Sequence, residues 1–323
     1  MKYVLAVLAL AAVLFAGMFW LLRNPPLTVP TPVASVTPSV EELKRDVNFL
    51  AGLTPNRSVA NLASLNRAAD YIRAELEETG CQIEEQRFGL REVTLRNVSC
   101  FHGPKNAPRL IVGAHYDVYS SRNPGADDNA SGVAGMLALA RLVARERPEL
   151  KHQIEFVAYT HEEHSNIGPS HTGSVNHANR IKRQGIDLKL MISVEMIGYF
   201  KDEPGSQRMP LAVLKPFYPD TANFIGVVGE LWDRRNVKLV KTLMQSTGDL
   251  PVYSLNAPVF IPEAGFSDHR SYWEQGLPAV MVTDTAFLRN PNYHRPTDTP
   301  DTLDYERMAE VVRGLYAVAT KLP

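Results

Sequence analysis

The fold is decided by RLIVGAHYD at residues 109–117, which is followed by GADDNASG at residues 125–132 and VAGMLALARLVAR at residues 133–145. The first stretch is a short apolar run that ends in polar residues, which is typical of a buried strand. The last stretch is apolar almost all round before it becomes basic, which predicts a largely buried helix. A buried strand, a glycine-rich turn and a buried helix in this order indicate an α/β fold.

The rest of the chain repeats this alternation. Strands are expected at residues 82–88, 94–100, 109–114, 153–159, 188–194, 223–229 and 279–283. Helices are expected at residues 40–53, 61–78, 132–145, 174–184, 235–247, 268–275 and 302–321. The pattern predicts a three-layer α/β sandwich around a mostly parallel mixed sheet, formed by a single globular domain over residues 40–323.

The 323-residue chain begins with an unbroken apolar run from Tyr3 to Leu22, with Lys2 before it and Arg23 after it. A run of this length spans a hydrocarbon core of about 30 Å. Bulky residues lie where a signal peptidase needs small ones, so we expect residues 1–23 to be an uncleaved anchor, with a cleaved signal segment as the alternative. The anchor would place the domain outside the cytoplasm, on the periplasmic or extracellular face. Residues 24–39 are proline-rich and predict a stiff linker.

Composition excludes few functions. The chain is 45% hydrophobic and 21% charged, as expected of a globular protein, and its net charge of -1 gives no reason to expect a nucleic-acid partner. Cys81 and Cys100 flank two expected strands, and they could form a disulfide in an oxidising compartment or remain two buried thiols. No pattern predicts an oligomeric state.

Acidic and imidazole side chains follow several expected strands. The candidates are His115, Asp117, Asp127, Glu162, Glu163, Glu195 and His294. Open α/β sheets place their sites at the carboxyl ends of their strands, so we expect these side chains to lie close together. Each has an ordinary alternative: Asp128 or Asn129 could cap the helix that follows, and Glu162-Glu163 could be a solvated pair. As a set, however, they contain the ligands that two zinc ions need.

The residue types suggest separate roles. A metal-bound histidine normally donates its other ring proton to a carboxylate, so His115 would bind metal and Asp117 would orient it. One carboxylate, Asp127, could bridge two cations. Glu162 could accept a proton from a zinc-activated water. Three further histidines, His161, His164 and His171, are expected to be loop residues because the other segments already fill the site.

These segments, together with Phe266-Ser267-Asp268-His269 and Tyr293-His294, resemble the two-zinc exopeptidase family that contains bacterial leucyl aminopeptidases, glutamate carboxypeptidase and the glutaminyl cyclases. The resemblance covers residues 40–323. It implies that His115 and Glu195 bind one zinc, that Glu163 and His294 bind the other, and that Asp127 bridges them. It also implies that Glu162 is the general base, that Asp117 orients His115, and that the Asp127–Asp128 peptide bond is cis.

The chain departs from the family pattern at Glu195, where the family most often has Asp, and at residues 164–172, which intervene before Gly173-Ser174. Neither change removes a ligand. We therefore expect a metallo-exopeptidase with two Zn2+ per chain that hydrolyses a terminal bond of a peptide substrate, with aminopeptidase action favoured over carboxypeptidase action. The alternatives are a single-zinc acyltransferase like the glutaminyl cyclases and an inactive binding module on the same fold. Residues 201–262 are expected to form a rim or lid over the site.

Overall fold

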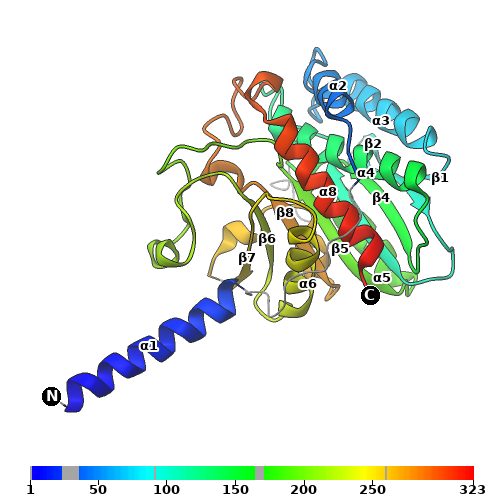
Figure 1. The fold of residues 1–323 in the computed structure, drawn as a ribbon. Helices are drawn as coiled ribbons and strands as arrows, with labels where there is room; N and C mark the ends of the chain where they lie inside the picture. The colour runs from blue at the N-terminus through cyan, green and yellow to red at the C-terminus, as the bar shows by residue number, and fades with distance from the viewer. Residues whose placement is uncertain (1, 24–35, 91, 164–170, 259) are drawn as a thin grey trace.

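The computed structural model describes residues 2–23, 36–90, 92–163, 171–258 and 260–323 (Figure 1). Within these residues lies one eight-stranded sheet with the order β1-β2-β4-β3-β5-β8-β6-β7. The strands are β1 (Gln82–Leu90), β2 (Val93–His102), β3 (Arg109–His115), β4 (Gln153–Tyr159), β5 (Leu188–Glu195), β6 (Ile225–Glu230), β7 (Val252–Ala257) and β8 (Ala279–Thr283). The central strands β4, β3, β5 and β8 are parallel, while β1, β2 and β6 introduce antiparallel pairs. The expectation of a mostly parallel mixed sheet is confirmed.

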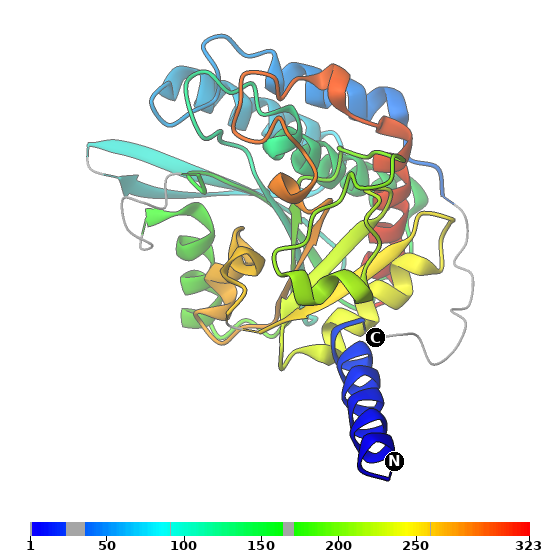
Figure 2. The same cartoon turned by 90° about the vertical axis from the view of Figure 1, so that its left-hand side faces the viewer.

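Helices cover both faces of this sheet (Figures 1 and 2). One face carries α2 (Val40–Ala51), α3 (Leu62–Glu77), α4 (Gly132–Glu146), α6 (Arg234–Gln245) and α8 (Tyr305–Lys321). The other face carries α5 (Gly173–Arg183) and α7 (His269–Trp273). The molecule is therefore the three-layer sandwich that the alternating pattern predicts.

The central strand β3 shows why both faces need helices. Its residues alternate in direction, so Leu110 and Val112 enter the core shared with α4 and α8, while Ile111 enters the core shared with α5 and α7. All three side chains are almost completely buried. A parallel strand that is apolar on both faces is stable only between two helical layers.

Two elements show the clearest differences from the sequence prediction. Strand β7 pairs in parallel with β6 at the edge of the sheet and was not expected. Helix α8 begins at Tyr305 instead of residue 302, because Asp304 caps it by accepting a hydrogen bond from Arg307 N and a 3-10 turn occupies Pro300–Thr302. Cys81 and Cys100 form a disulfide that joins the start of β1 to β2, which settles the alternative left open by the sequence.

Helix α1 (Lys2–Arg23) projects from the domain, and its carboxyl-terminal part, from Phe15 onward, contacts the domain next to β7 and α6 (Figure 1). Residues Tyr3–Trp20 have a mean hydropathy of 2.3, and by length and composition they could cross a membrane. The expected linker falls mainly on residues 24–35, which lie outside the described residues.

Candidate metal centre

The carboxyl edge of the parallel strands brings distant residues together. Strand β3 ends at His115 and β5 ends at Glu195, while Glu162 and Glu163 follow the end of β4. His115 Nε2 lies 3.5 Å from Glu195 Oε2. The register of parallel strands, and not sequence proximity, creates this neighbourhood.

The glycine-rich loop between β3 and α4 reaches the same edge. Gly125 adopts a φ of 67°, and a Cβ there would lie 2.4 Å from the carbonyl oxygen of Asp128, so only glycine fits. The fully buried guanidinium of Arg57 donates hydrogen bonds to the carbonyl oxygens of Pro124 and Gly125. The carboxylate of Asp298 accepts hydrogen bonds from the backbone N–H groups of Asp127 and Asp128. The loop is therefore held from both sides.

The Asp128 carboxylate lies between two imidazoles. Its Oδ1 is 3.4 Å from His115 Nε2, and its Oδ2 is 3.2 Å from His294 Nε2. His294 Nε2 is also 3.1 Å from Glu163 Oε2. Two groups of possible ligands result, His115 with Asp128 and Glu195, and Asp128 with Glu163 and His294; within each group the ligand atoms lie within 4.8 Å of one another. Asp128 belongs to both groups.

The place between the two imidazoles, which was expected for Asp127, is thus taken by its neighbour Asp128. Asp127 points away from the imidazoles: its Oδ1 accepts a hydrogen bond from Gly198 N at 3.0 Å, and its Oδ2 accepts one from Asn290 Nδ2 at 2.7 Å. Burial and the neighbouring Asp284 carboxylate raise the pKa of Asp127 well above its usual value. The prediction for Asp127 is wrong because Asp-Asp in a loop has no periodicity that shows which carboxylate faces the site.

The cis peptide bond also lies one residue later than expected. It joins Asp128 to Asn129 and not Asp127 to Asp128. Asn129 stabilises the start of the helix that follows, because its Oδ1 accepts a hydrogen bond from Gly132 N at the start of α4. The same Oδ1 accepts from Met196 N, and the Nδ2 group donates to Val194 O, so Asn129 also joins α4 to the end of β5.

Asp117 connects the two strand ends. Its Oδ1 lies 3.5 Å from His115 Nδ1, as expected for a carboxylate that orients the imidazole. Its two oxygens also accept hydrogen bonds from the backbone N–H groups of Glu162 at 3.1 Å and Glu163 at 3.3 Å. One side chain therefore fixes both the histidine and the glutamate pair, although the sequence suggested only the first contact.

Several carboxylates at this edge have raised pKa values. Burial, and then the nearby Asp128 carboxylate, raises the pKa of Glu163 to about 8. Burial raises the pKa of Glu162 well above its usual range, and the carboxylates of Glu163, Asp268 and Glu195 add to the effect. Burial raises the pKa of Asp268 to about 7. Such a concentration of buried negative charge is unfavourable without cations.

The donor set fits a metal. Asp128 Oδ2, Glu163 Oε1 and His294 Nε2 are buried, and none has a hydrogen-bond partner in the described part of the chain. Buried polar atoms are normally satisfied. Imidazole nitrogens and carboxylate oxygens are the ligands that zinc accepts, and Glu195 Oε2, the oxygen that faces His115, accepts a hydrogen bond from Ser267 Oγ at 2.8 Å. The Ser267-Asp268-His269 segment thus contributes Ser267 and the buried Asp268 to the site.

His294 is held by stacking. Its ring lies between Tyr119, at a centroid distance of 3.9 Å, and Tyr293, at 3.7 Å. The backbone of His294 has a φ of 59°, which is uncommon for a residue with a side chain. Neither tyrosine was identified as a site residue from the sequence, since aromatic residues in turns carry no specific signal.

The three further histidines were expected to be loop residues, and several buried polar residues were not expected at the site. His161 is buried and His171 is half-buried, and neither belongs to a possible ligand group among the described residues. His164 and most of the loop at residues 164–172 lie outside the described residues. Arg57, Asn290 and Asp284 are buried at the site but were not identified, because a single Arg, Asn or Asp without a motif gives no signal.

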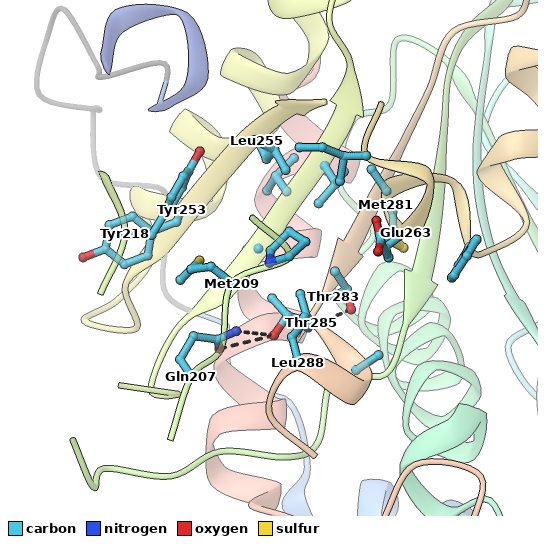
Figure 3. Close-up of a pocket in the computed structure, with 18 of the residues that line it drawn as sticks. Gln207, Met209, Tyr218, Tyr253, Leu255, Glu263, Met281, Thr283, Thr285 and Leu288 are labelled. Atoms are coloured by element: carbon cyan, nitrogen blue, oxygen red, sulfur yellow. Dashed lines mark hydrogen bonds between the residues drawn. The ribbon is translucent and has the colours of Figure 1, made fainter. Parts of the chain in front are cut away.

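A pocket of about 910 Å³, part of it open to solvent, adjoins Glu195 (Figure 3). Its wall is mainly apolar and includes Met209, Tyr218, Tyr253, Leu255 and Met281. Much of this wall comes from residues 201–262, in agreement with the expected rim. A mainly apolar wall suits an apolar side chain.

The chain is similar to several known proteins. The profile of Peptidase family M28 matches residues 97–319. The chain is 43% identical over 284 residues to YfbL, an uncharacterized protein of Escherichia coli K12, and the match covers 86% of both chains. It is 25% identical over 303 residues to a probable leucine aminopeptidase 1 of Trichophyton verrucosum, which covers 88% of this chain and 74% of that protein.

Solved structures share the fold. The LapA aminopeptidase of Legionella pneumophila matches with a TM-score of 0.71 and 22% identity, covering 88% of this chain and 73% of that one. A zinc aminopeptidase of Bacillus subtilis matches with a TM-score of 0.69 and 14% identity, covering 89% and 97%. A glutaminyl cyclase of Bacteroides thetaiotaomicron matches with a TM-score of 0.66 and 17% identity, covering 89% and 99%. At these identities the likeness concerns the fold.

Proposed function

The chain belongs to peptidase family M28, and we propose that it is a zinc-dependent aminopeptidase that hydrolyses the first bond of a peptide substrate. The observation that carries the proposal is the position of Asp128, whose two oxygens lie 3.4 Å from His115 Nε2 and 3.2 Å from His294 Nε2. One carboxylate shared by two donor groups is the arrangement that a pair of cations requires. The leucine aminopeptidase among the relatives supports action at the amino end.

Two Zn2+ ions would be held by chain residues alone. One would be bound by His115, Asp128 and Glu195, and the other by Asp128, Glu163 and His294. When bound, zinc supplies an electrophile for the scissile carbonyl and lowers the pKa of a water molecule. Asp117 would keep the His115 ring in the orientation needed for binding.

Glu162 would move the proton. Its side chain is half-buried beside the carboxylates of Glu163 and Glu195, and its backbone is fixed by Asp117, so it can accept a proton from the attacking water and deliver it to the leaving amine. A glutamate whose pKa is raised above its ordinary value is better matched to both transfers than one with an ordinary pKa.

The test separates this proton transfer from metal binding. Glu162→Gln should lower kcat on aminoacyl anilides by about a hundredfold to ten-thousandfold, the usual contribution of a general base, while the metal content stays at the parent value. The matched control is Glu78→Gln, a change at an exposed glutamate at the end of α3, which should leave both unchanged. If Glu162→Gln turns over at the parent rate, the role assigned to Glu162 is wrong.

The first side chain of the substrate would enter the pocket beside Glu195. The mainly apolar wall favours a residue such as leucine over a charged or a very small one (Figure 3). A panel of anilides that differ only in the first residue tests this preference, because lysyl and glutamyl substrates should then be cleaved least efficiently.

A glutaminyl cyclase of the same fold is the second candidate, since one such enzyme is among the structural neighbours. The two functions differ in metal count and product. Two metal ions per chain and hydrolysis of leucyl anilide support the peptidase, whereas one ion and ring closure of amino-terminal glutamine would replace it with the cyclase. If neither substrate reacts while metal is bound, the inactive binding module becomes the explanation.

We further propose that α1 anchors the domain in a membrane with the catalytic part outside the cytoplasm. The apolar span Tyr3–Trp20 supports the anchor, and the Cys81–Cys100 disulfide supports an oxidising compartment. Residues 24–39 would then be the linker and residues 40–323 the catalytic domain. Amino-terminal sequencing of the membrane fraction should find the uncleaved chain; a mature chain that begins after residue 23 would indicate a signal segment instead.

A further inference from the structure

Polar side chains of the domain bind the carboxyl end of α1 by hydrogen bonds. The last four carbonyl groups of any helix lack partners within it. Here Arg234 Nη2 donates to Trp20 O at 2.9 Å, Tyr218 Oη donates to Leu22 O at 3.3 Å, and Lys241 Nζ donates to Arg23 O at 2.5 Å. The end of the apolar helix is therefore capped directly by the catalytic domain.

Aromatic contacts add to this attachment of α1 to the domain. The Arg23 guanidinium lies over the Tyr253 ring, with its Cζ 4.5 Å from the centroid, and Phe15 stacks on Phe217 at 4.7 Å. The contacts place β7 and the 3-10 helix at Ala212–Phe217 beside the last turns of α1. If α1 spans a bilayer, this part of the domain lies at the depth of the lipid headgroups.

The same part of the domain carries an exposed tryptophan and a basic helix. Trp232 is 90% exposed and lies two residues before the start of α6. Basic residues recur along α6 at Arg234, Arg235, Lys238 and the buried Lys241, against the two acids Glu230 and Asp233 that precede it. We call Trp232 and these four basic residues the basic face.

We propose that the basic face binds the headgroups of anionic phospholipids beside the anchor. The proposal rests on α1 as a membrane span, and it is independent of the peptidase function. Tryptophan concentrates at the membrane interface, and basic side chains next to a span are attracted to anionic lipids by about a factor of five each. The direct contact between Arg234 and Trp20 makes the basic face continuous with the end of the span.

A cavity at the edge of this face suits one headgroup. It encloses about 540 Å³, part of it open to solvent, and it is lined by Arg23, Lys241, Tyr253 and Phe19, among others. Burial lowers the pKa of the Lys241 ammonium to about 8, and the positive charges of Arg23 and Lys238 act in the same direction. An anion would relieve this repulsion. Tyr253 also lines the substrate pocket, so lipid and substrate would both bind beside this residue.

The test measures how fast Lys238 is acetylated in the full chain reconstituted in nanodiscs. Discs of phosphatidylcholine alone are compared with discs of an equimolar mixture with phosphatidylglycerol, and the modified lysines are quantified by mass spectrometry. We expect Lys238 to react about fivefold more slowly in the anionic discs, and high salt to restore its rate. Lys44 on α2, on the far side of the domain in Figures 1 and 2, should react equally in both and serves as the internal control.

Variants locate the effect. Trp232→Ser/Arg235→Glu should abolish the difference at Lys238, whereas the control Arg67→Glu on the exposed side of α3 should keep it. Equal rates at Lys238 in both discs would overturn the proposal, as would failure of the chain to enter discs at all. Protection by soluble glycerol phosphate in phosphatidylcholine discs would also overturn it, because the site would then recognise a free phosphate and not a membrane surface.

Discussion

Strand β4 carries one buried glutamate within it, and two half-buried glutamates follow its end in an opposite electrostatic environment. Inside the strand, the completely buried Glu155 lies 2.9 Å from Arg109 Nη1 and 2.9 Å from His177 Nε2, and Arg180 adds a third contact. Burial alone would raise the pKa of Glu155, but His177 and the two arginines lower it to about 2. We call these four residues the Glu155 network.

A second group of acids lies beyond the end of the strand, and we call it the acid cluster: Asp128, Glu162, Glu163, Glu195 and Asp268. The ion pairs that its members form within the described residues are with His115 and His294. The pKa values of Glu162, Glu163, Glu195 and Asp268 are raised, chiefly by burial. The difference indicates that one group of buried acids is neutralised by the chain itself, whereas the other needs cations from outside.

The largest expected effect separates two adjacent residues. Asp128→Asn should lower activity at least about a thousandfold and reduce the metal content, because it removes the one carboxylate shared by both ligand groups. Asp127→Asn should retain metal, because Asp127 hydrogen-bonds to Gly198 and Asn290 and not to the imidazoles. Metal analysis and kcat/KM of the two variants check this contrast. Equal loss of metal in both would show that the shared position is not confined to Asp128.

Removal of metal should destabilise the protein in a pH-dependent way. At a free metal concentration a thousandfold above Kd, bound metal would contribute about 4 kcal/mol to the free energy of unfolding. In the metal-free protein, Glu163 keeps its proton up to about pH 8, whereas the unfolded chain releases it near 4.5, so stability should fall as the pH rises through this interval. Urea unfolding with and without chelator at several pH values measures both effects. A metal-free protein whose stability rises over this interval would contradict the interpretation of the acid cluster.

The contribution of the Glu155 network to stability should depend on pH in the opposite direction. The folded protein holds the Glu155 carboxyl ionised down to about pH 2, whereas the unfolded chain protonates it near 4.5, so its contribution is present above 4.5 and is lost as the pH falls to 2. Glu155→Gln should lower the free energy of unfolding by about 3 kcal/mol at neutral pH, because it removes the buried carboxylate that pairs with Arg109, His177 and Arg180. The control is Glu84→Gln, which changes the half-exposed partner of Arg180 and should cost less than about 0.5 kcal/mol. Equal losses would mean that burial does not distinguish the two pairs.

The smallest expected effect concerns Tyr119, the exposed ring that stacks on His294. Tyr119→Ala should weaken binding of one metal ion about tenfold, at the lower end of the range for residues that orient a ligand. Tyr119→Phe keeps the stack and should bind metal as the parent does. Competition with a chelator of known affinity measures the difference, and parent-like binding by Tyr119→Ala would assign the positioning of His294 to Tyr293 alone.

The strands and helices were predictable to within a few residues wherever periodicity was strong. β4 and β8 have the expected bounds, and α4 extends the expected helix by one residue. The edge strand β7 was missed because its short segment between Pro251 and Pro258 shows no clear alternation of apolar and polar residues. Its parallel pairing with β6 depends on a partner that is distant in sequence.

At the site, the sequence by itself determined the residue types and their order along the chain, because each candidate follows the end of a strand or lies in a turn. It therefore indicated the neighbourhood of His115, Glu163, Glu195 and His294. Only the tertiary structure decided that Asp128 and not Asp127 faces the imidazoles. The physical reason is that the direction of a loop side chain is set by contacts from remote segments, here the hydrogen bonds from Gly198 and Asn290 that hold Asp127 away and those that Asp298 accepts from the loop backbone.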